Sequence, residues 1–471
     1  MNAVGRVTEP IRPVLTRDEA IAVGRKIMEY SSAATVLVRL MHHATGTTRI
    51  SPRGTCASSD GETIGLTIET QFGGKAGVWL STNQIDDASL RTIVPYVERL
   101  AKRGLALPMV FLPPDVIGPR TYEPVRLWHA RSIDALAEER AAPLSAMLDA
   151  GRQAQLRSSV FVGVSARATC VMDTSGVVAY GEETDTELTA TCWTADFKGS
   201  GWSGHASRDW GALDPAAVMR EAIDIANRSR SRVALEPGRR TAILAPAAVA
   251  QLVRVMTYAF SAESTIVFQN TPFSRPPRGS RVGERVFDPR INMRSDPSDP
   301  DGGYLPFFAG GYPQRALPWI ERGVLTHLAY TPGYAAVMGQ SPAADIPHAI
   351  RLEAVAGSES TVDAMIAGCK EGVYVNRFSD VSVLDQKTGM LSGLTRDGCF
   401  LVKNGKVQQA VKNFRFVESP WFILNRLEAL GVSHRAALGY TPGGDAWPLP
   451  PIIVPPLMVR DFHFSGLADA V

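Results

Sequence analysis

The stretch that most restricts the fold of this chain is Leu384 to Val407, LDQKTGMLSGLTRDGCFLVKNGKV. A turn at Lys387-Thr388-Gly389 is followed by a strand-like run of apolar residues. A second turn lies at Asn404-Gly405, and an Asn-Gly pair between such runs is the strongest short-range signal for a β-hairpin. We therefore expect paired antiparallel strands in this part of the protein.

The length of the chain predicts more than one domain. Its 471 residues exceed what one ordinary hydrophobic core accommodates, so two or three domains are expected. A polar stretch at 227–233, NRSRSRV, precedes the segment Leu235-Glu236-Pro237-Gly238. We place the main boundary there, which divides the chain into an N-terminal domain, 1–234, and a C-terminal domain, 235–471.

The N-terminal half alternates helix and strand patterns. Thr16 and Glu19 form a capping box before an apolar helical stripe, and Asp214-Pro215 opens another helix. This order predicts an α+β domain whose sheet is largely antiparallel. The other helices are expected over about 87–103, with Pro95 inside, and 133–154, and the strands over 35–41, 63–68, 77–80, 158–172 and 187–196.

Composition restricts the class of protein. The chain is 45% hydrophobic and 20% charged, as is ordinary for soluble domains, and no run approaches the roughly 18 apolar residues of a membrane span. Five cysteines without CxxC spacing favour reduced thiols, and the first residues lack the apolar core of a secretory signal, so we expect a cytoplasmic location. A net charge of +2 demands no polyanionic partner. We expect neither nucleic-acid nor membrane binding.

Four segments in order resemble the TldD/PmbA family, whose members are regarded as peptidase subunits and were once called modulators of DNA gyrase. The hairpin stretch is similar to a family pattern that reads roughly D-x-x-T-G-x-x-S and then G-[FC]-x-[IV]-x-N-G-K. The resemblance implies an α+β N-terminal domain followed by a β-rich C-terminal domain of TldD/PmbA type. The other three segments are LEPGRRTAILAPAAVAQLV at 235–253, WIERGVLTHLAYTPGYAAVMG at 319–339 and SESTVDAMIAGCKEGVYV at 358–375.

The resemblance also bears on metal binding. The family's zinc-binding subunit carries H-E-x-x-x-H on the helix after the L-x-P-G segment, with a distal cysteine near the C-terminus; zinc peptidases place two imidazoles on one helix face. Here the corresponding helix, predicted over Val255–Thr265, has Tyr258, Ala259 and Glu263 at those positions. None of the eight histidines lies in it, and no cysteine follows Cys399. We predict no catalytic residue, metal ligand or cofactor in this chain.

The resemblance therefore implies a TldE/PmbA-type subunit, a pseudoenzyme that lacks the zinc motif. Such a chain is expected to form a heterodimer with a TldD-like zinc-binding subunit, or a homodimer when alone. Its function would be to shape the substrate channel for peptide or amide hydrolysis by that partner. An alternative is a stand-alone binding or scaffold protein for an acidic peptide or metabolite, without hydrolytic activity.

An arginine-rich segment follows the degenerate helix directly. Between 270 and 294 six arginines and four prolines accompany two acidic residues. One interpretation is a loop over the substrate channel whose guanidiniums bind carboxylates of the substrate. The competing interpretation, a solvated surface loop, is favoured by its composition. The candidate substrate contacts are Arg275, Arg278, Arg281 and Arg285.

Three other motifs are weaker indications of a functional site. Gly199–Gly204 matches GxGxxG, but no helix opens at its last glycine, so we expect a flexible glycine loop and no dinucleotide site. His327 and the turn 345–348 could form a metal site, although hydrogen-bonded loop or sheet histidines are the simpler interpretation. Cys399 lacks the flanking signature of a catalytic thiol and is expected to be a small strand residue.

Overall fold

Helix α1 (Arg17–Tyr30) begins at the predicted capping box. The Thr16 hydroxyl accepts a hydrogen bond from the Glu19 backbone, and the Glu19 carboxylate accepts one from the Thr16 backbone. The computed structural model describes residues 14–72, 78–103, 118–135, 137–308, 310–343, 347, 349–439 and 450–468. Helices and strands mix throughout these residues, so the predicted α+β class is confirmed.

The N-terminal half forms a six-stranded antiparallel sheet of order β3-β2-β1-β4-β5-β6. Its strands are longer than the sequence predicts, because the alternation continues through polar residues such as His43, Thr45 and Thr47 that the pattern excluded. The strands are β1 (Thr35–Ile50), β2 (Cys56–Gln71), β3 (Val78–Thr82), β4 (Arg157–Asp173), β5 (Val178–Trp193) and β6 (Ser200–Ser207).

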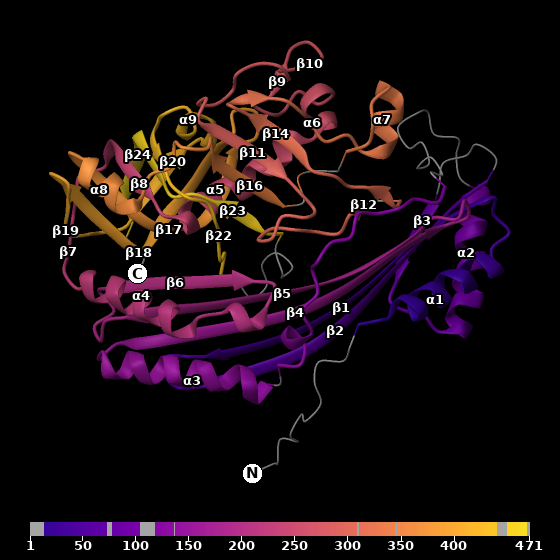
Figure 1. The fold of residues 1–471 in the computed structure, drawn as a ribbon, viewed down its shortest axis with the longest axis horizontal. Helices are drawn as coiled ribbons and strands as arrows, with labels where there is room; N and C mark the ends of the chain where they lie inside the picture. The colour runs from indigo at the N-terminus through magenta and orange to yellow at the C-terminus, as the bar shows by residue number, and fades with distance from the viewer. Residues whose placement is uncertain are drawn as a thin grey trace.

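All four long helices of this half cover one face of the sheet. Helices α1 and α2 (Asp87–Arg103) pack on Val38 and Leu40 of β1, while α3 (Ala137–Gln153) and α4 (Pro215–Arg228) pack on Val160 and Leu188. These strand residues are even-numbered, and side chains alternate across a strand, so the odd-numbered residues point to the other face. Figure 1 shows the C-terminal half lying over that second face.

The C-terminal half is built around two large sheets. One has the order β15-β14-β11-β16-β23-β22; in the other, five strands, β17, β8, β24, β20 and β18, close into a ring through successive pairings. Buried phenylalanines from three of these strands pack together, with the rings of Phe378 and Phe416 4.4 Å apart. Most neighbours are antiparallel; the parallel pairs are β17–β8, β16–β23 and β19–β7. The predicted β-rich C-terminal domain is confirmed.

The elements of this half are short apart from the hairpin strands and β24. The sheet strands are β7 (Arg232–Val233), β8 (Gly238–Leu244), β11 (Ile291–Ser295), β14 (Leu317–Glu321), β15 (Val324–Leu325), β16 (Ile350–Ala354), β17 (Glu371–Asp385), β18 (Met390–Lys403), β19 (Lys406–Val411), β20 (Phe414–Glu418), β21 (Leu427–Leu430), β22 (His434–Arg435), β23 (Ile452–Val454) and β24 (Leu457–Leu467). Two-stranded ribbons join β9 (Ser274–Arg275) to β10 (Gly279–Ser280) and β12 (Phe307–Phe308) to β13 (Tyr312–Pro313). Helices are α5 (Pro246–Met256), α6 (Ala262–Ile266), α7 (Pro332–Met338), α8 (Val362–Gly368) and α9 (Pro420–Ile423).

The hairpins predicted in Leu384–Val407 are present. Strands β17 and β18 are joined by the turn that contains Gly389, and β18 turns into β19 at Asn404-Gly405. All three of these turn residues have positive φ, which glycine and asparagine adopt most readily. The local turn chemistry alone therefore predicted this part of the sheet.

The glycines at Gly199–Gly204 belong to an edge strand. The expected flexible loop is wrong, because β6 occupies Ser200–Ser207 and pairs with β5. Helix α4 lies so close to this strand that a Cβ on Gly201 would collide with the carbonyl oxygen of Ala222. The glycines permit close helix–sheet packing and provide no turn for a pyrophosphate.

Several expectations at the level of the whole chain remain. No helix among the described residues is long and apolar enough to cross a membrane. The boundary after residue 234 stays a prediction, although β7 at Arg232–Val233 already pairs with β19. Asp345 and His348 lie outside the described residues, so their proposed site with His327 stays a hypothesis.

Candidate functional site

The segment at the family's metal-helix position is not one helix. Helix α5 ends at Met256, a 3-10 turn covers Thr257–Phe260, and α6 begins only at Ala262. Between them Ser261 is extended, with φ −61° and ψ 120°. The predicted continuous helix over 255–265 is therefore wrong. The reason is tertiary: Ala329 donates to the carbonyl of Phe260 at 2.7 Å and accepts from the amide of Ala262 at 2.8 Å, which draws the backbone into a strand-like bridge.

The three side chains at the degenerate motif positions have different surroundings. The Tyr258 hydroxyl donates to the carbonyl of Gln386 at 2.5 Å, and burial raises the pKa of this phenol to about 12. Ala259 is fully buried, and its carbonyl accepts from the Thr265 hydroxyl at 2.9 Å. Glu263 is half-buried on α6 beyond the break. A neutral phenol and a methyl group are not zinc ligands, which leaves the Glu263 carboxylate alone, whereas a zinc site needs three or four protein ligands.

The arginine-rich segment forms a hairpin that packs on α6. Gln269 donates to the carbonyl of Gly279 at 3.0 Å, which ties the β9–β10 ribbon to the end of that helix. Arg275 and Arg281 both pair with Glu284, at 2.7 and 3.0 Å. The arginine-rich segment, which follows the degenerate helix in the sequence, therefore also contacts α6 in the structure.

Two arginines of this segment are available to a ligand. Arg278 and Arg285 are exposed, and neither has an ion-pair partner in the part of the chain that the structure describes. Arg290, farther along, chelates Asp288 and donates to the carbonyl of Leu427 at 2.7 Å. Of the four predicted contacts, the geometry therefore favours Arg278 and Arg285 over the two that share Glu284.

A cavity of about 550 Å³ adjoins the hairpin. Ser280 and Val282 line it, together with Arg315, His327 and Tyr330. The His327 Nδ1 lies 2.7 Å from the carbonyl oxygen of Pro318, as expected for a hydrogen-bonded loop histidine. Arg315 was not among the candidates from the sequence, because no local motif marks it and it lies 30 to 40 positions after the four hairpin arginines.

A comparison with known families bears on the C-terminal half of the chain. The family model described as PmbA/TldA metallopeptidase C-terminal domain matches residues 237–466, which include the broken helix, the arginine hairpin and the Leu384–Val407 strands. The C-terminal half of the chain is a TldD/PmbA-family domain. No curated protein sequence matches the chain.

The chain is also similar to solved structures, and this similarity covers both of its halves. A candidate modulator of DNA gyrase from Thermotoga maritima has a TM-score of 0.79 at 15% identity, covering 95% of this chain and 98% of its own. One from Bacteroides thetaiotaomicron has the same TM-score and the same coverages at 16% identity. TldE from Thermococcus kodakarensis has a TM-score of 0.77 at 16% identity, covering 94% and 99%. The TM-scores show a shared fold, and at identities this low they show the fold alone.

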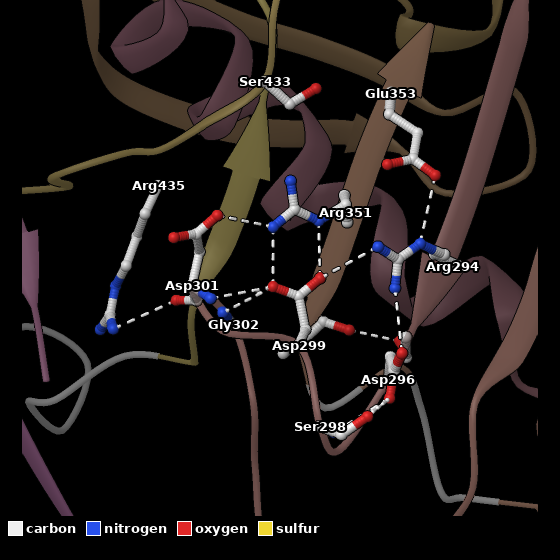
Figure 2. Close-up of polar contacts among 12 residues, drawn as sticks. Arg294, Asp296, Ser298, Asp299, Asp301, Gly302, Arg351, Glu353, Ser433 and Arg435 are labelled. Atoms are coloured by element: carbon white, nitrogen blue, oxygen red, sulfur yellow. Dashed lines mark hydrogen bonds and ion pairs between the residues drawn. The ribbon is translucent and has the colours of Figure 1, made fainter. Parts of the chain in front are cut away.

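An ionic cluster lies at strands β11 and β16 of the C-terminal domain. Asp299 is 3% exposed and receives two hydrogen bonds from Arg351, at 2.6 and 2.7 Å (Figure 2). Arg294 approaches the same carboxylate at 3.3 Å and also binds Glu353 at 3.1 Å. Burial, the largest single effect, would raise the pKa of Asp299, but the hydrogen bonds from Arg351 and the Asp301 amide, together with the charges of Arg351 and Arg294, outweigh it and lower the pKa. The cluster links β11 and β16 to the loop that follows β11.

The segment 433–439 joins this domain to the N-terminal sheet. Arg435 pairs with Asp185 of β5, and the backbone amides of Leu438 and Gly439 donate to the Glu187 carboxylate at 3.2 and 3.0 Å. Burial raises the pKa of Glu187 to about 7, and the neighbouring Asp185 charge adds to this shift. This part of the contact between the domains is therefore polar, and its Glu187 carboxyl titrates near neutral pH.

Proposed function

We propose that this chain is the non-zinc-binding subunit of a TldD/TldE-type metallopeptidase complex. The observation that carries the proposal is the helix interruption at Ser261, with Tyr258, Ala259 and Glu263 where the zinc-binding subunit has H-E-x-x-x-H. The family description as a metallopeptidase supports the reaction class. The partner's zinc-bound water would hydrolyse the amide bond, since zinc lowers the pKa of its water to about 7.

In this proposal the chain contributes walls of the substrate channel and no acid, base or ligand. Its effect on the rate comes from positioning and closure, which contribute strongly without a catalytic side chain. The surface near α6 suits this role, because an arginine hairpin and a cavity of about 550 Å³ adjoin it. A cytoplasmic heterodimer with a TldD-like chain is the expected assembly.

Peptide cleavage is expected only when this chain and a TldD-like partner are combined. The measurement is release of fragments from an unfolded peptide by each chain alone and by the pair. Elemental analysis of this chain alone, after dialysis, serves as the control and should find no stoichiometric zinc. Cleavage by this chain without a partner would contradict the proposal, as would a pair no faster than the partner alone; a chain that binds peptides without promoting cleavage is instead a stand-alone binding protein.

Replacing Arg278 and Arg285 by alanine in the pair should raise KM for acidic peptides about three- to tenfold, because each exposed guanidinium offers a charge-assisted hydrogen bond. kcat should stay unchanged, since ground state and transition state lose the same contact. The matched control is Arg275→Ala, whose guanidinium is occupied by Glu284 at 2.7 Å. An equal KM change in the control, or none in the double variant, would assign the hairpin to a solvated surface loop.

A further inference from the structure

A second cavity, of about 260 Å³, lies between the two domains. Its lining from the N-terminal sheet comes from β1, β4, β5 and β6, and its lining from the C-terminal domain comes from β17, β18 and the end of segment 433–439. Three arginines, Arg49, Arg377 and Arg396, face one carboxylate, Asp397, among the described lining residues. We call this space the seam cavity. Its excess of guanidiniums indicates an anionic ligand group.

Arg377 is held in a fixed position at this cavity. Its Nε donates to Asp397 Oδ2 at 2.9 Å, its Nη2 forms an ion pair with the same oxygen at 2.8 Å, and its guanidinium lies 4.9 Å from the centre of the Trp202 ring. The remaining nitrogen, Nη1, donates to no described residue; it lies 3.7 Å from where a Cβ on Gly439 would be. A preorganised guanidinium with a free nitrogen at a cavity wall is an anion-binding group.

One carboxylate oxygen of Asp397 at this cavity has no hydrogen-bond donor among the described residues. Its side chain is 1% exposed, and its Oδ1 has no hydrogen-bond partner among the described residues. An unsatisfied buried carboxylate oxygen is costly unless a bound group supplies a donor. A simple carboxylate such as acetate would satisfy the arginines and leave this oxygen unpaired. The two requirements together favour a ligand that carries both a carboxylate and N–H groups.

Arg49 provides a second guanidinium from the opposite wall. It is exposed on β1, without an ion-pair partner in the described ranges. The hydroxyls of Ser159, Thr189 and Thr191 line the same wall, and none of them bonds another described residue. Hydroxyls without a hydrogen-bond partner beside an arginine can donate to the carbonyls of a peptide backbone and accept from its N–H groups. The volume lies just below the roughly 300 Å³ at which small-molecule sites begin, so the cavity suits a ligand of a few residues.

We propose that the seam cavity binds the C-terminal carboxylate of a short peptide, with Arg49 and the Arg377 Nη1 on the carboxylate and a peptide N–H on Asp397 Oδ1. The proposal rests on the proposed function, because short peptides with free carboxylates are the products of amide hydrolysis. The present proposal identifies short peptides with a free carboxylate as the ligand class and places their site between the two domains. It assigns no catalytic residue.

The test is isothermal titration of the purified chain, without partner, with trialanine, trialanine amide and acetate. Trialanine should bind, the amide about tenfold more weakly because it lacks the charged acceptor, and acetate more weakly still. The variant Arg49→Gln should lose about tenfold in affinity for trialanine. The matched control is Arg39→Gln, on the same strand, where Arg39 pairs with Glu69 at 3.3 Å outside the cavity.

Several outcomes would overturn this inference. They are equal binding of the acid and the amide, binding of acetate as tight as that of trialanine, no binding at all, or equal losses in the Arg49 and Arg39 variants. The unfolding midpoint of Arg49→Gln identifies any loss caused by misfolding, and Arg49→Lys should then retain part of the affinity. The titration needs no cleavage activity, so failure of the paired peptidase assay leaves it intact, and the reverse holds too.

Discussion

Replacing Asp299 by alanine is expected to lower the free energy of unfolding by about 3–5 kcal/mol, because it removes one partner from a buried ion pair. The Arg351 guanidinium, whose side chain is 13% exposed, would lose two hydrogen bonds of 2.6 and 2.7 Å. The backbone amides of Asp301 and Gly302 would lose their acceptor, Asp299 Oδ1, at 3.0 and 3.1 Å. Figure 2 shows all of these groups converging on the one carboxylate.

Urea denaturation of the wild-type chain and the variant measures this effect. The matched control is Asp301→Ala, in the same loop, because Asp301 is 53% exposed and, among the described residues, its carboxylate binds Arg351 alone, at 2.8 Å. An exposed pair of this kind contributes about 0–1 kcal/mol. Equal losses in the two variants would mean that burial of Asp299 does not set the strength of the cluster.

The free energy of unfolding of the wild-type chain should decrease as the pH rises from about 4.5 to 7, because Glu187 loses its proton on unfolding. The variant Glu187→Gln should lack this part of the pH dependence. The pKa of Glu187 is raised from 4.5 to about 7, chiefly by burial, so the folded state holds a proton that the unfolded state releases. This stabilisation is complete below pH 4.5 and is lost as the pH rises through 7. A shift of this size corresponds to about 3 kcal/mol.

The measurement compares unfolding free energies at pH 5 and pH 8 in the wild-type chain and in the variant. Subtracting the two differences removes the contribution of other groups, including Asp185 and Arg435 beside Glu187. Glu236→Gln, at an exposed position, is the control and should follow the wild-type dependence. A Glu187→Gln variant with the same pH dependence as the wild-type chain would show that this carboxylate does not titrate on unfolding.

Local sequence chemistry predicted the elements whose signals are short-range. The capping box at Thr16, the Asp214-Pro215 helix start and the Asn404-Gly405 turn are each encoded within a few residues, and all three are present. The alternation of apolar residues located five of the six strands of the N-terminal sheet and missed β6. It underestimated their lengths, since polar residues on the face that meets the second domain look like loop residues in a one-dimensional pattern.

The sequence by itself determined the α+β class, the C-terminal hairpins and the absence of histidine at 258, 259 and 263, because each depends on residue identity or local spacing. Only the tertiary structure decided that the helix breaks at Ser261, since the bonds to Ala329 that break it cross nearly seventy residues of chain. It likewise decided that Arg49 and Asp397 share one cavity. Such pairings depend on the packing of distant strands, which local propensity does not encode.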